Sequence, residues 1–279
     1  AAAFGDMSQG SQQVEALGNS VRTLVTGDGS PSRNIHQITV ASLGDSVDFG
    51  GDTSPAFTNL GQANQGFANA TRGIFSGGGS QPNARINVME YVTIMSGGDS
   101  VDFGDLTNVV GRAASFSSPV RGIVGGGAPA ANSSETNVIN FLTIATLGDA
   151  QDFGDLTVAR QGSGSGCSNA TRGVFAGGLD DPGSYSDVID YVTIASAGNA
   201  VNFGDLSSER GFASSASSPT RGVFVGGYTL SGADGAPANN GNKFIEYVEF
   251  ASEGNAVDFG DLITPVYIHC GTSNGHGGL

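Results

Sequence analysis

The sequence predicts an all-β protein, a β-propeller of four-stranded antiparallel blades, because three motifs recur together along it. The first is an arginine followed by apolar residues and a glycine pair, as in residues 172–178. The second is an aromatic and β-branched run such as 191–195, and the third is a Phe-Gly pair such as Phe203-Gly204. Each recurs at intervals of about 50 residues, a period typical of propellers and other repeat folds, whose units bury their apolar faces only against neighbours.

Each unit has the length and composition of four short strands, as the copy at 157–206 illustrates. Small residues predict a closely packed inner strand, and an apolar run that stops at Gly177-Gly178 predicts the second. A loop is expected over 179–186. The third strand alternates, with Ile189 and Tyr191 on one face and Val192 on the other. The four expected strands are 161–168, 171–176, 188–196 and 201–206.

The repeat extends over nearly the whole chain, so we expect a single domain, 1–279. The complete units are 7–52, 53–106, 107–156, 157–206 and 207–262. Residues 1–6 resemble a lone fourth strand, and residues 263–279 resemble a first strand followed by a damaged second strand. Together, the two ends favour a partial sixth blade. Such a blade would close the ring and remove an exposed sheet edge. Five blades is the alternative, because a third strand is missing from these pieces. The N-terminus enters the repeat part-way, which indicates a processed or partial product.

Composition excludes several classes of function. Glycine accounts for 46 of 279 residues and charged residues for 13%, against about 25% in an average protein, which indicates a turn-rich chain. The formal charge of −15 makes nucleic acid and anionic membranes poor partners. Apolar runs of about five residues are far shorter than the roughly 20 that a membrane-spanning helix needs. Cys167 and Cys270 lie in different repeats and leave the redox compartment open.

The unit resembles the kelch repeat, in which an aromatic strand, a linker ending in arginine, a strand ending in Gly-Gly and a strand centred on tyrosine follow one another. Here these are residues 153–156, Arg160, 174–178 and Tyr191. The motifs are closer still to the kelch-like repeats of tailed bacteriophages, including a C-terminal tail like residues 273–279. That resemblance implies a virion or fibre-like structural protein on the outside of the particle, on its tail or a fibre. Other virion subunits would be its partners, together with a glycan or protein of the host surface.

Carboxylates at every third residue are the most chemical-looking feature of the repeat. One interpretation is calcium, which takes several oxygen ligands. The other, which we favour, is structural: the first Asp or Asn accepts turn hydrogen bonds and the last Asp pairs with a repeat arginine. A spacing of three does not match a calcium loop. The calcium candidates are Asp99, Asp102, Asp105, Asp149, Asp152 and Asp155; no other cofactor is expected.

Arginine recurs at fixed places in a chain with a single lysine. Because the guanidinium is planar and donates in pairs, this recurrence favours hydrogen bonds to carboxylates or carbonyls between blades. The alternative is a ring of cations around an anionic ligand. The recurring arginines are Arg72, Arg121, Arg172 and Arg221 at one place and Arg112, Arg160 and Arg210 at another. The recurring phenylalanines are expected in the core between blades, at about 1.5 to 3 kcal/mol each: Phe49, Phe103, Phe153, Phe203 and Phe259.

Specific recognition is expected where the copies differ, in the loops after the Gly-Gly pair. The longest is 228–242. Tyr185, Tyr228, Asn239 and Asn240 would give aromatic faces and amides suited to sugar hydroxyls. The open alternative is that these loops are spacers or contacts with other subunits.

Enzymatic function is not expected, although a kelch-type carbohydrate-active enzyme or oxidase, and a cellular propeller that binds a protein, are the alternatives. Copper oxidases of this fold need several histidines, and the chain has three, His36, His269 and His276. His269 and Cys270 are adjacent but have no further ligands nearby in the sequence. No nucleophile motif is followed by the partners it would need.

Overall fold

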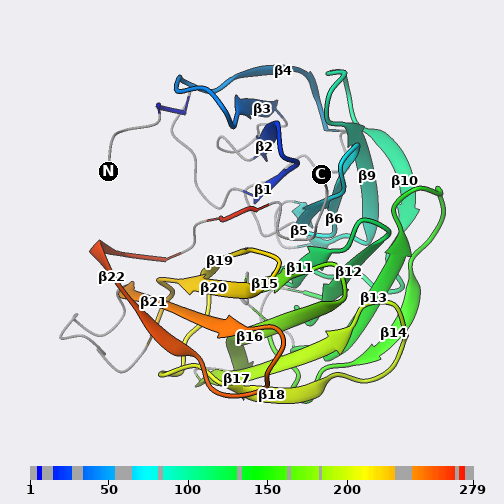
Figure 1. The fold of residues 1–279 in the computed structure, drawn as a ribbon. Helices are drawn as coiled ribbons and strands as arrows, with labels where there is room; N and C mark the ends of the chain where they lie inside the picture. The colour runs from blue at the N-terminus through cyan, green and yellow to red at the C-terminus, as the bar shows by residue number, and fades with distance from the viewer. Residues whose placement is uncertain are drawn as a thin grey trace.

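The computed structural model is all-β and consists of five four-stranded antiparallel sheets arranged as the blades of a propeller (Figure 1). It describes residues 5–7, 15–26, 34–53, 65–80, 84–130, 134–161, 165–181, 184–229, 241–267 and 270–273. Within these ranges no helix has the length and apolar character needed to cross a membrane. The propeller prediction is confirmed, with five complete blades rather than six; Asn239, Asn240, His269 and His276 lie outside the described residues.

The strands follow one another from the centre of the ring outward in every blade. Blade one consists of β1 (Glu15–Gly18), β2 (Arg22–Thr26), β3 (Asn34–Thr39) and β4 (Val47–Asp52). Blade two consists of β5 (Gln65–Ala68), β6 (Arg72–Ser76), β9 (Val88–Thr93) and β10 (Val101–Asp105), with a small hairpin of β7 (Gly79–Ser80) and β8 (Ala84–Arg85). Blade three consists of β11 (Ala114–Ser117), β12 (Arg121–Gly125), β13 (Val138–Thr143) and β14 (Gln151–Asp155). Blade four consists of β15 (Gly166–Ser168), β16 (Arg172–Asp181), β17 (Ser184–Thr193) and β18 (Val201–Asp205). Blade five consists of β19 (Ser214–Ser217), β20 (Arg221–Val225), β21 (Asn242–Glu249) and β22 (Val257–Val266).

The hydrophobic core lies between the blades. In blade four, Ile189 packs toward blade five while Val192 and Ile194 pack toward blade three, as the alternation of β17 predicts. Each apolar cluster combines residues of two neighbouring sheets, so no blade has a core of its own. This explains why the repeat must occur in series.

In blades one to four, the motif of a Phe-Gly pair followed by Asp fastens each blade to the next. Gly154 has φ of +140°, and a Cβ there would lie 2.5 Å from the backbone carbon of Gly198 in blade four. Only glycine therefore allows this approach. Asp155 on one side of it donates its backbone N–H to Asn199 Oδ1 (3.1 Å) and accepts from the N–H of Ala200 (2.8 Å). We call this arrangement the clasp.

Two expectations about single segments are wrong. The strands of blade four do not stop at the Gly177-Gly178 pair: β16 and β17 continue through register shifts to Asp181 and Ser184, so much of the expected loop is a longer hairpin. Phe259 is not in the core. Its side chain is 59% exposed, whereas the other four phenylalanines are at most 4% exposed. Among the described residues, no complete blade follows blade five.

Candidate functional site

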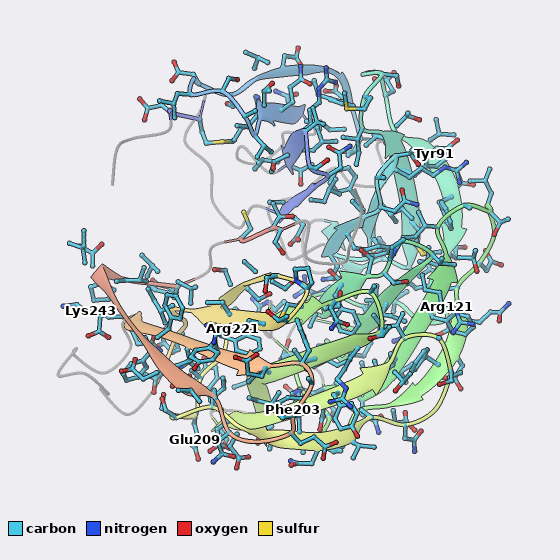
Figure 2. The ribbon with its side chains drawn as sticks, viewed as in Figure 1. Tyr91, Arg121, Phe203, Glu209, Arg221 and Lys243 are labelled. Carbon is cyan, nitrogen blue, oxygen red and sulfur yellow. The ribbon has the colours of Figure 1, made fainter. Side chains whose placement is uncertain are left out.

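The repeated arginines of blades one to four join neighbouring blades. Figure 2 labels one of them, Arg121, and the copy in blade five, Arg221. The guanidinium of Arg172 lies over the ring of Tyr191, 4.3 Å from its centroid, and its Nη1 donates to the carbonyl oxygen of Phe250 in blade five at 2.8 Å. Arg22, Arg72 and Arg121 donate in the same way to Ile94, Ile144 and Ile194 of the following blade. The acceptors are backbone carbonyls, so these side chains form no ring of cations directed at a ligand.

The carboxylate series is used in the clasps. Asp99 and Asp149 accept the backbone N–H groups of Asp52 and Asp105 in the preceding blades, at 3.0 Å each. Asp152 accepts from Gly154 in its own strand at 3.2 Å. Within the described residues, no three His, Cys, Asp or Glu side chains are grouped as a metal site would require. The last Asp of blades one to four takes part through its backbone. Among the described residues, Asp105, Asp155 and Asp205 do not form the expected ion pair with a repeat arginine.

A second set of arginines lies inside single blades as buried ion pairs. Arg160 donates to Asp190 at 2.8 Å and Arg210 to Glu246 at 2.6 Å, all four side chains being at most 3% exposed. Burial lowers the pKa of the Arg160 guanidinium, and the Asp190 charge opposes this shift. Arg112 does not belong to this set. It shares its position with Phe212, since both adopt positive φ (59° and 57°).

Val110 and Asn140 occupy the corresponding positions of blade three. In blade three, an apolar residue thus replaces the arginine, and its partner on the third strand is neutral. Asn140 still accepts from the backbone N–H of Thr107, as Asp190 does from that of Thr157. Blades three and four thus fill the same structural position with a neutral pair and a charged pair. Removing only one partner of a buried ion pair is costly, because it leaves the other charge buried and unpaired.

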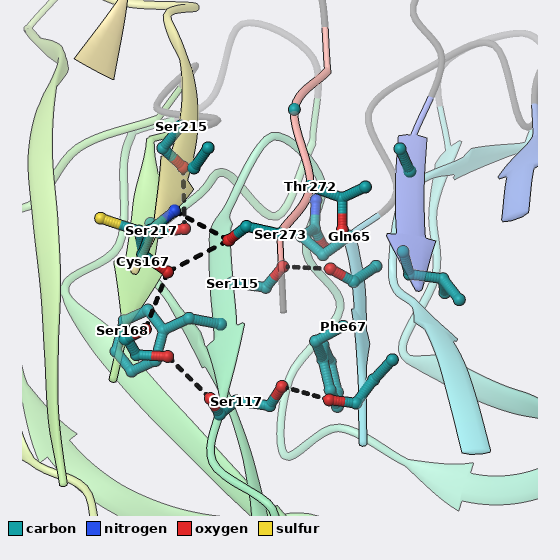
Figure 3. A pocket seen from close by; sticks show the side chains of 18 of the residues that line it. Gln65, Phe67, Ser115, Ser117, Cys167, Ser168, Ser215, Ser217, Thr272 and Ser273 are labelled. Atoms are coloured by element: carbon teal, nitrogen blue, oxygen red, sulfur yellow. Dashed lines mark hydrogen bonds between the residues drawn. The ribbon is translucent and has the colours of Figure 1, made fainter. Parts of the chain in front are cut away.

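The centre of the ring holds a small cavity of about 70 Å³, lined by the inner strands and residues 271–273 (Figure 3). Ligand pockets usually measure about 300 to 1,000 Å³. The hydroxyl groups around it join neighbouring inner strands: Ser117 donates to Ala68, Ser168 to Ser117 and Ser217 to Ser168, at 2.6 to 2.8 Å. Cys167 also lines the cavity, and both cysteines are free thiols.

Aromatic side chains from separate connections meet where the copies differ. The ring of Tyr228 lies 5.6 Å from that of Tyr185 and 5.5 Å from that of Tyr267. Phe212 lies 6.5 Å from Tyr185, and the guanidinium of Arg112 lies 5.8 Å from the Phe212 ring. We call these five residues the aromatic cluster. It spans blades three to five.

Local structure explains why these side chains converge. The longer hairpin of blade four places Tyr185 opposite Leu179, beyond the Gly177-Gly178 pair. Phe212 follows Gly211, whose backbone exchanges two hydrogen bonds with that of Tyr228, at 2.7 and 3.0 Å. The connection before β19, which carries Phe212, thus lies beside the loop after β20, which carries Tyr228. Both segments contribute to one surface.

The cluster combines a buried ring with accessible ones. Tyr185 is 8% exposed, while Tyr228 is partly exposed and Tyr267 is 44% exposed. Burial is the main reason that the pKa of Tyr185 is raised to about 12, with Tyr228 adding to the shift. The Tyr185 hydroxyl therefore keeps its proton at neutral pH and can donate a hydrogen bond.

The structure brings together two of the four residues expected from the loops, Tyr185 and Tyr228. Tyr267, Phe212 and Arg112 were not expected there. The signal that could have found Phe212 is its place in the repeat, because Gly211-Phe212 corresponds to Gly111-Arg112. His36 is buried in β3.

No family model matches this chain, and no curated protein matches it. Among solved structures, the chain is similar to the structure of YjhT, with a TM-score of 0.75 and 10% identity over 95% of this chain and 88% of that one. This is one of 240 solved chains that match. At this level of identity the likeness shows the fold alone, and so common a fold is compatible with many functions.

Proposed function

We propose that the protein is a non-enzymatic recognition propeller, in which the aromatic cluster binds a glycan. The observation that carries the proposal is the packing of the Tyr228 ring against those of Tyr185 and Tyr267. Tyr185 lies in the lengthened hairpin of blade four, Tyr228 follows β20 and Tyr267 follows β22. Aromatic faces stack on the apolar faces of sugars, and phenolic hydroxyls donate and accept hydrogen bonds. Arg112 adds donors at the edge of the cluster.

The use of the repeated polar residues supports a binding role over catalysis. In blades one to four the repeat arginines that join neighbouring blades donate to carbonyls, and the described carboxylates at Asp99, Asp149 and Asp152 accept backbone N–H groups. These groups hold the frame together, so the partly exposed rings of Tyr228 and Tyr267 are better candidates for contact with a ligand.

We place this propeller on the outside of a phage particle, on the tail or a fibre. Support comes from the likeness of its repeats to the kelch-like repeats of tailed phages, and the strong acidity argues against partners that carry phosphate backbones. In this proposal it requires no cofactor, its neighbours are other virion subunits, and its ligand is a glycan of the host surface. Mass spectrometry of purified particles tests the placement: a fixed copy number is expected, and absence from particles would contradict it.

A glycan array tests the binding role. We expect the intact protein to bind a defined set of sugars, and the Tyr228→Ala and Tyr267→Ala variants to lose at least about tenfold in affinity. Tyr267→Phe keeps the ring and serves as the conservative variant, while Leu43→Ala, 72% exposed and on blade one, is the matched control. Equal binding by all four variants would refute the cluster as the site. Turnover of a bound sugar, or stoichiometric copper, would favour an enzyme instead.

A further inference from the structure

Two arginines from different blades meet at the edge of the aromatic cluster. Arg85 lies in β8, in the small hairpin of blade two, and Arg112 lies in the connection that leads to β11 of blade three. The Arg85 side chain runs along the backbone of Gly111, where a Cβ would lie 2.6 Å from its Cδ and 2.9 Å from its Nη1. Glycine at 111 thus leaves room for Arg85 directly beside Arg112.

The two guanidinium groups are close enough to affect each other. The pKa of Arg85, which is 8% exposed, is lowered by burial and further by the charge of Arg112. Acidic residues outnumber basic ones in this chain by 26 to 11, so two neighbouring positive charges are a marked local exception. Like charges repel in a partly buried place, and an anion bound beside them would be attracted by both.

Arg112 differs in its contacts from the arginines of the frame. Arg172 donates to a carbonyl of the next blade, and Arg160 pairs with Asp190. Among the described residues, Arg112 forms no ion pair. It is partly exposed, and its guanidinium lies 5.8 Å from the ring of Phe212. Its donors are therefore accessible to a ligand.

The arginines lie at the end of the central cavity. Arg112 directly precedes Ala113, which lines that cavity, and Phe212 has the same place in front of β19. Phe212 in turn contacts Tyr185 of blade four. A ligand on the aromatic cluster can thus reach Arg112 without leaving this surface.

The hydroxyl of Tyr185 adds a donor near Arg112. Burial and Tyr228 raise the pKa of Tyr185 to about 12, and the charge of Arg112 acts on it in the opposite direction. The phenol keeps its proton at neutral pH, so both it and the guanidinium can donate hydrogen bonds. Carboxylate and sulfate oxygens only accept, and hydrogen bonds between an anion and arginine are among the strong ones.

We propose that the ligand is an acidic glycan: a sugar ring packs on Tyr228 and Tyr267, and its one carboxylate or sulfate ester group binds Arg112. Arg85 adds a second positive charge behind it. This inference rests on the proposed glycan binding and names the class of sugar. The net charge of −15 disfavours ligands with many negative charges, but salt screens distant charges beyond about 8 Å. A single anionic group in contact with Arg112 is governed by its near neighbours.

Oligosaccharides that differ only in the acidic group test this preference. Each uronate-containing oligosaccharide is compared with its carboxyl-reduced form, and each singly sulfated one with its unsulfated form, by isothermal titration calorimetry. We expect the acidic member of a bound pair to bind at least about tenfold more tightly, as one charged hydrogen bond would provide. Added NaCl should narrow the difference. The kind of pair that responds distinguishes carboxylate from sulfate.

Arg112→Gln removes the charge and is expected to abolish the preference for the acidic member, while binding of the neutral member stays unchanged. Arg112→Lys keeps the charge and should keep part of the preference. Arg221→Gln is the matched control for net charge, because Arg221 begins β20, at the end away from Tyr228, and is 45% exposed. Circular dichroism shows that each variant is folded.

The outcomes separate this inference from the glycan proposal. Equal binding of acidic and neutral members, or a full preference in Arg112→Gln, would overturn the acidic ligand and leave glycan binding intact. Absence of binding by every oligosaccharide would overturn both. A preference that is lost in Arg112→Gln but unaffected by Tyr228→Ala would support the anion site and contradict the role of the aromatic rings.

Discussion

Replacing Arg172 by lysine tests whether a repeat arginine acts by its shape or by its charge. The variant keeps the positive charge but loses the planar group that stacks on Tyr191 and donates to Phe250 of the next blade. A hydrogen bond from a charged donor contributes about 1.5 to 3 kcal/mol and the stacking about 0.5 to 1 kcal/mol. Lysine retains part of both, so we expect a loss of about 1 to 2 kcal/mol.

That loss corresponds to a fall of about 2 to 3 °C in Tm for 279 residues, from the average unfolding entropy per residue. The chain has no tryptophan, so circular dichroism is the suitable probe. Arg221→Lys is the matched control, because Arg221 has the same stacking but pairs with Glu249 of its own blade. We expect its Tm to stay within error of the parent. An unchanged Tm for Arg172→Lys, or equal shifts for both, would refute the reasoning.

Three further predictions concern buried charge, close backbone contact and pH. Arg160→Val leaves Asp190 buried without its ion-pair partner and is expected to lower the free energy of unfolding in urea by about 3 to 5 kcal/mol. Adding Asp190→Asn, which copies the pair Val110 and Asn140, is expected to recover most of this loss. No recovery would contradict the view that the two pairs fill the same structural position. Gly154→Ala is expected to lower the stability of the fold far more than Gly260→Ala. Both glycines have φ near +140°, but only at Gly154 would a Cβ meet the backbone of the next blade. Similar losses of stability would mean that backbone strain alone matters. Burial is the main reason that the pKa of Glu15 is raised from 4.5 to about 8. The contribution of the protonated group to stability is therefore full below pH 4.5 and is lost as the pH rises to about 8. Glu15→Gln should make the free energy of unfolding depend less on pH across that range, and an unchanged dependence would contradict the raised pKa.

The repeat made most of the fold predictable. Motifs that recur together fix the strands of a blade, and the alternation of Ile189 with Val192 assigns each side chain to one neighbour. The clasp could be anticipated only in part. The first Asp or Asn was expected to accept hydrogen bonds within its own turn, but it accepts a backbone N–H group from the preceding blade. Nothing local shows that Gly154 meets the backbone of Gly198. That contact depends on how two blades pack.

The errors arose where a residue's surroundings differ from those of its copies. Phe259 has the same local sequence as Phe203, but in the part of the chain that the structure describes no complete blade follows to cover it. A repeat motif carries no information about that neighbour. Arg112 was aligned with Arg210 by residue type, whereas backbone conformation aligns it with Phe212. Tyr267 was missed because it follows a fourth strand and belongs to no variable loop.

The central claim is that residues common to all repeats build the frame while the aromatic cluster recognises the ligand. The most direct test is the dissociation constant of the strongest array glycan, measured in parallel for Tyr228→Ala and Arg172→Lys together with their Tm values. The account predicts weak binding with unchanged Tm for the first, and unchanged binding with lowered Tm for the second. The reverse pattern, with binding lost in Arg172→Lys and kept in Tyr228→Ala, would contradict it.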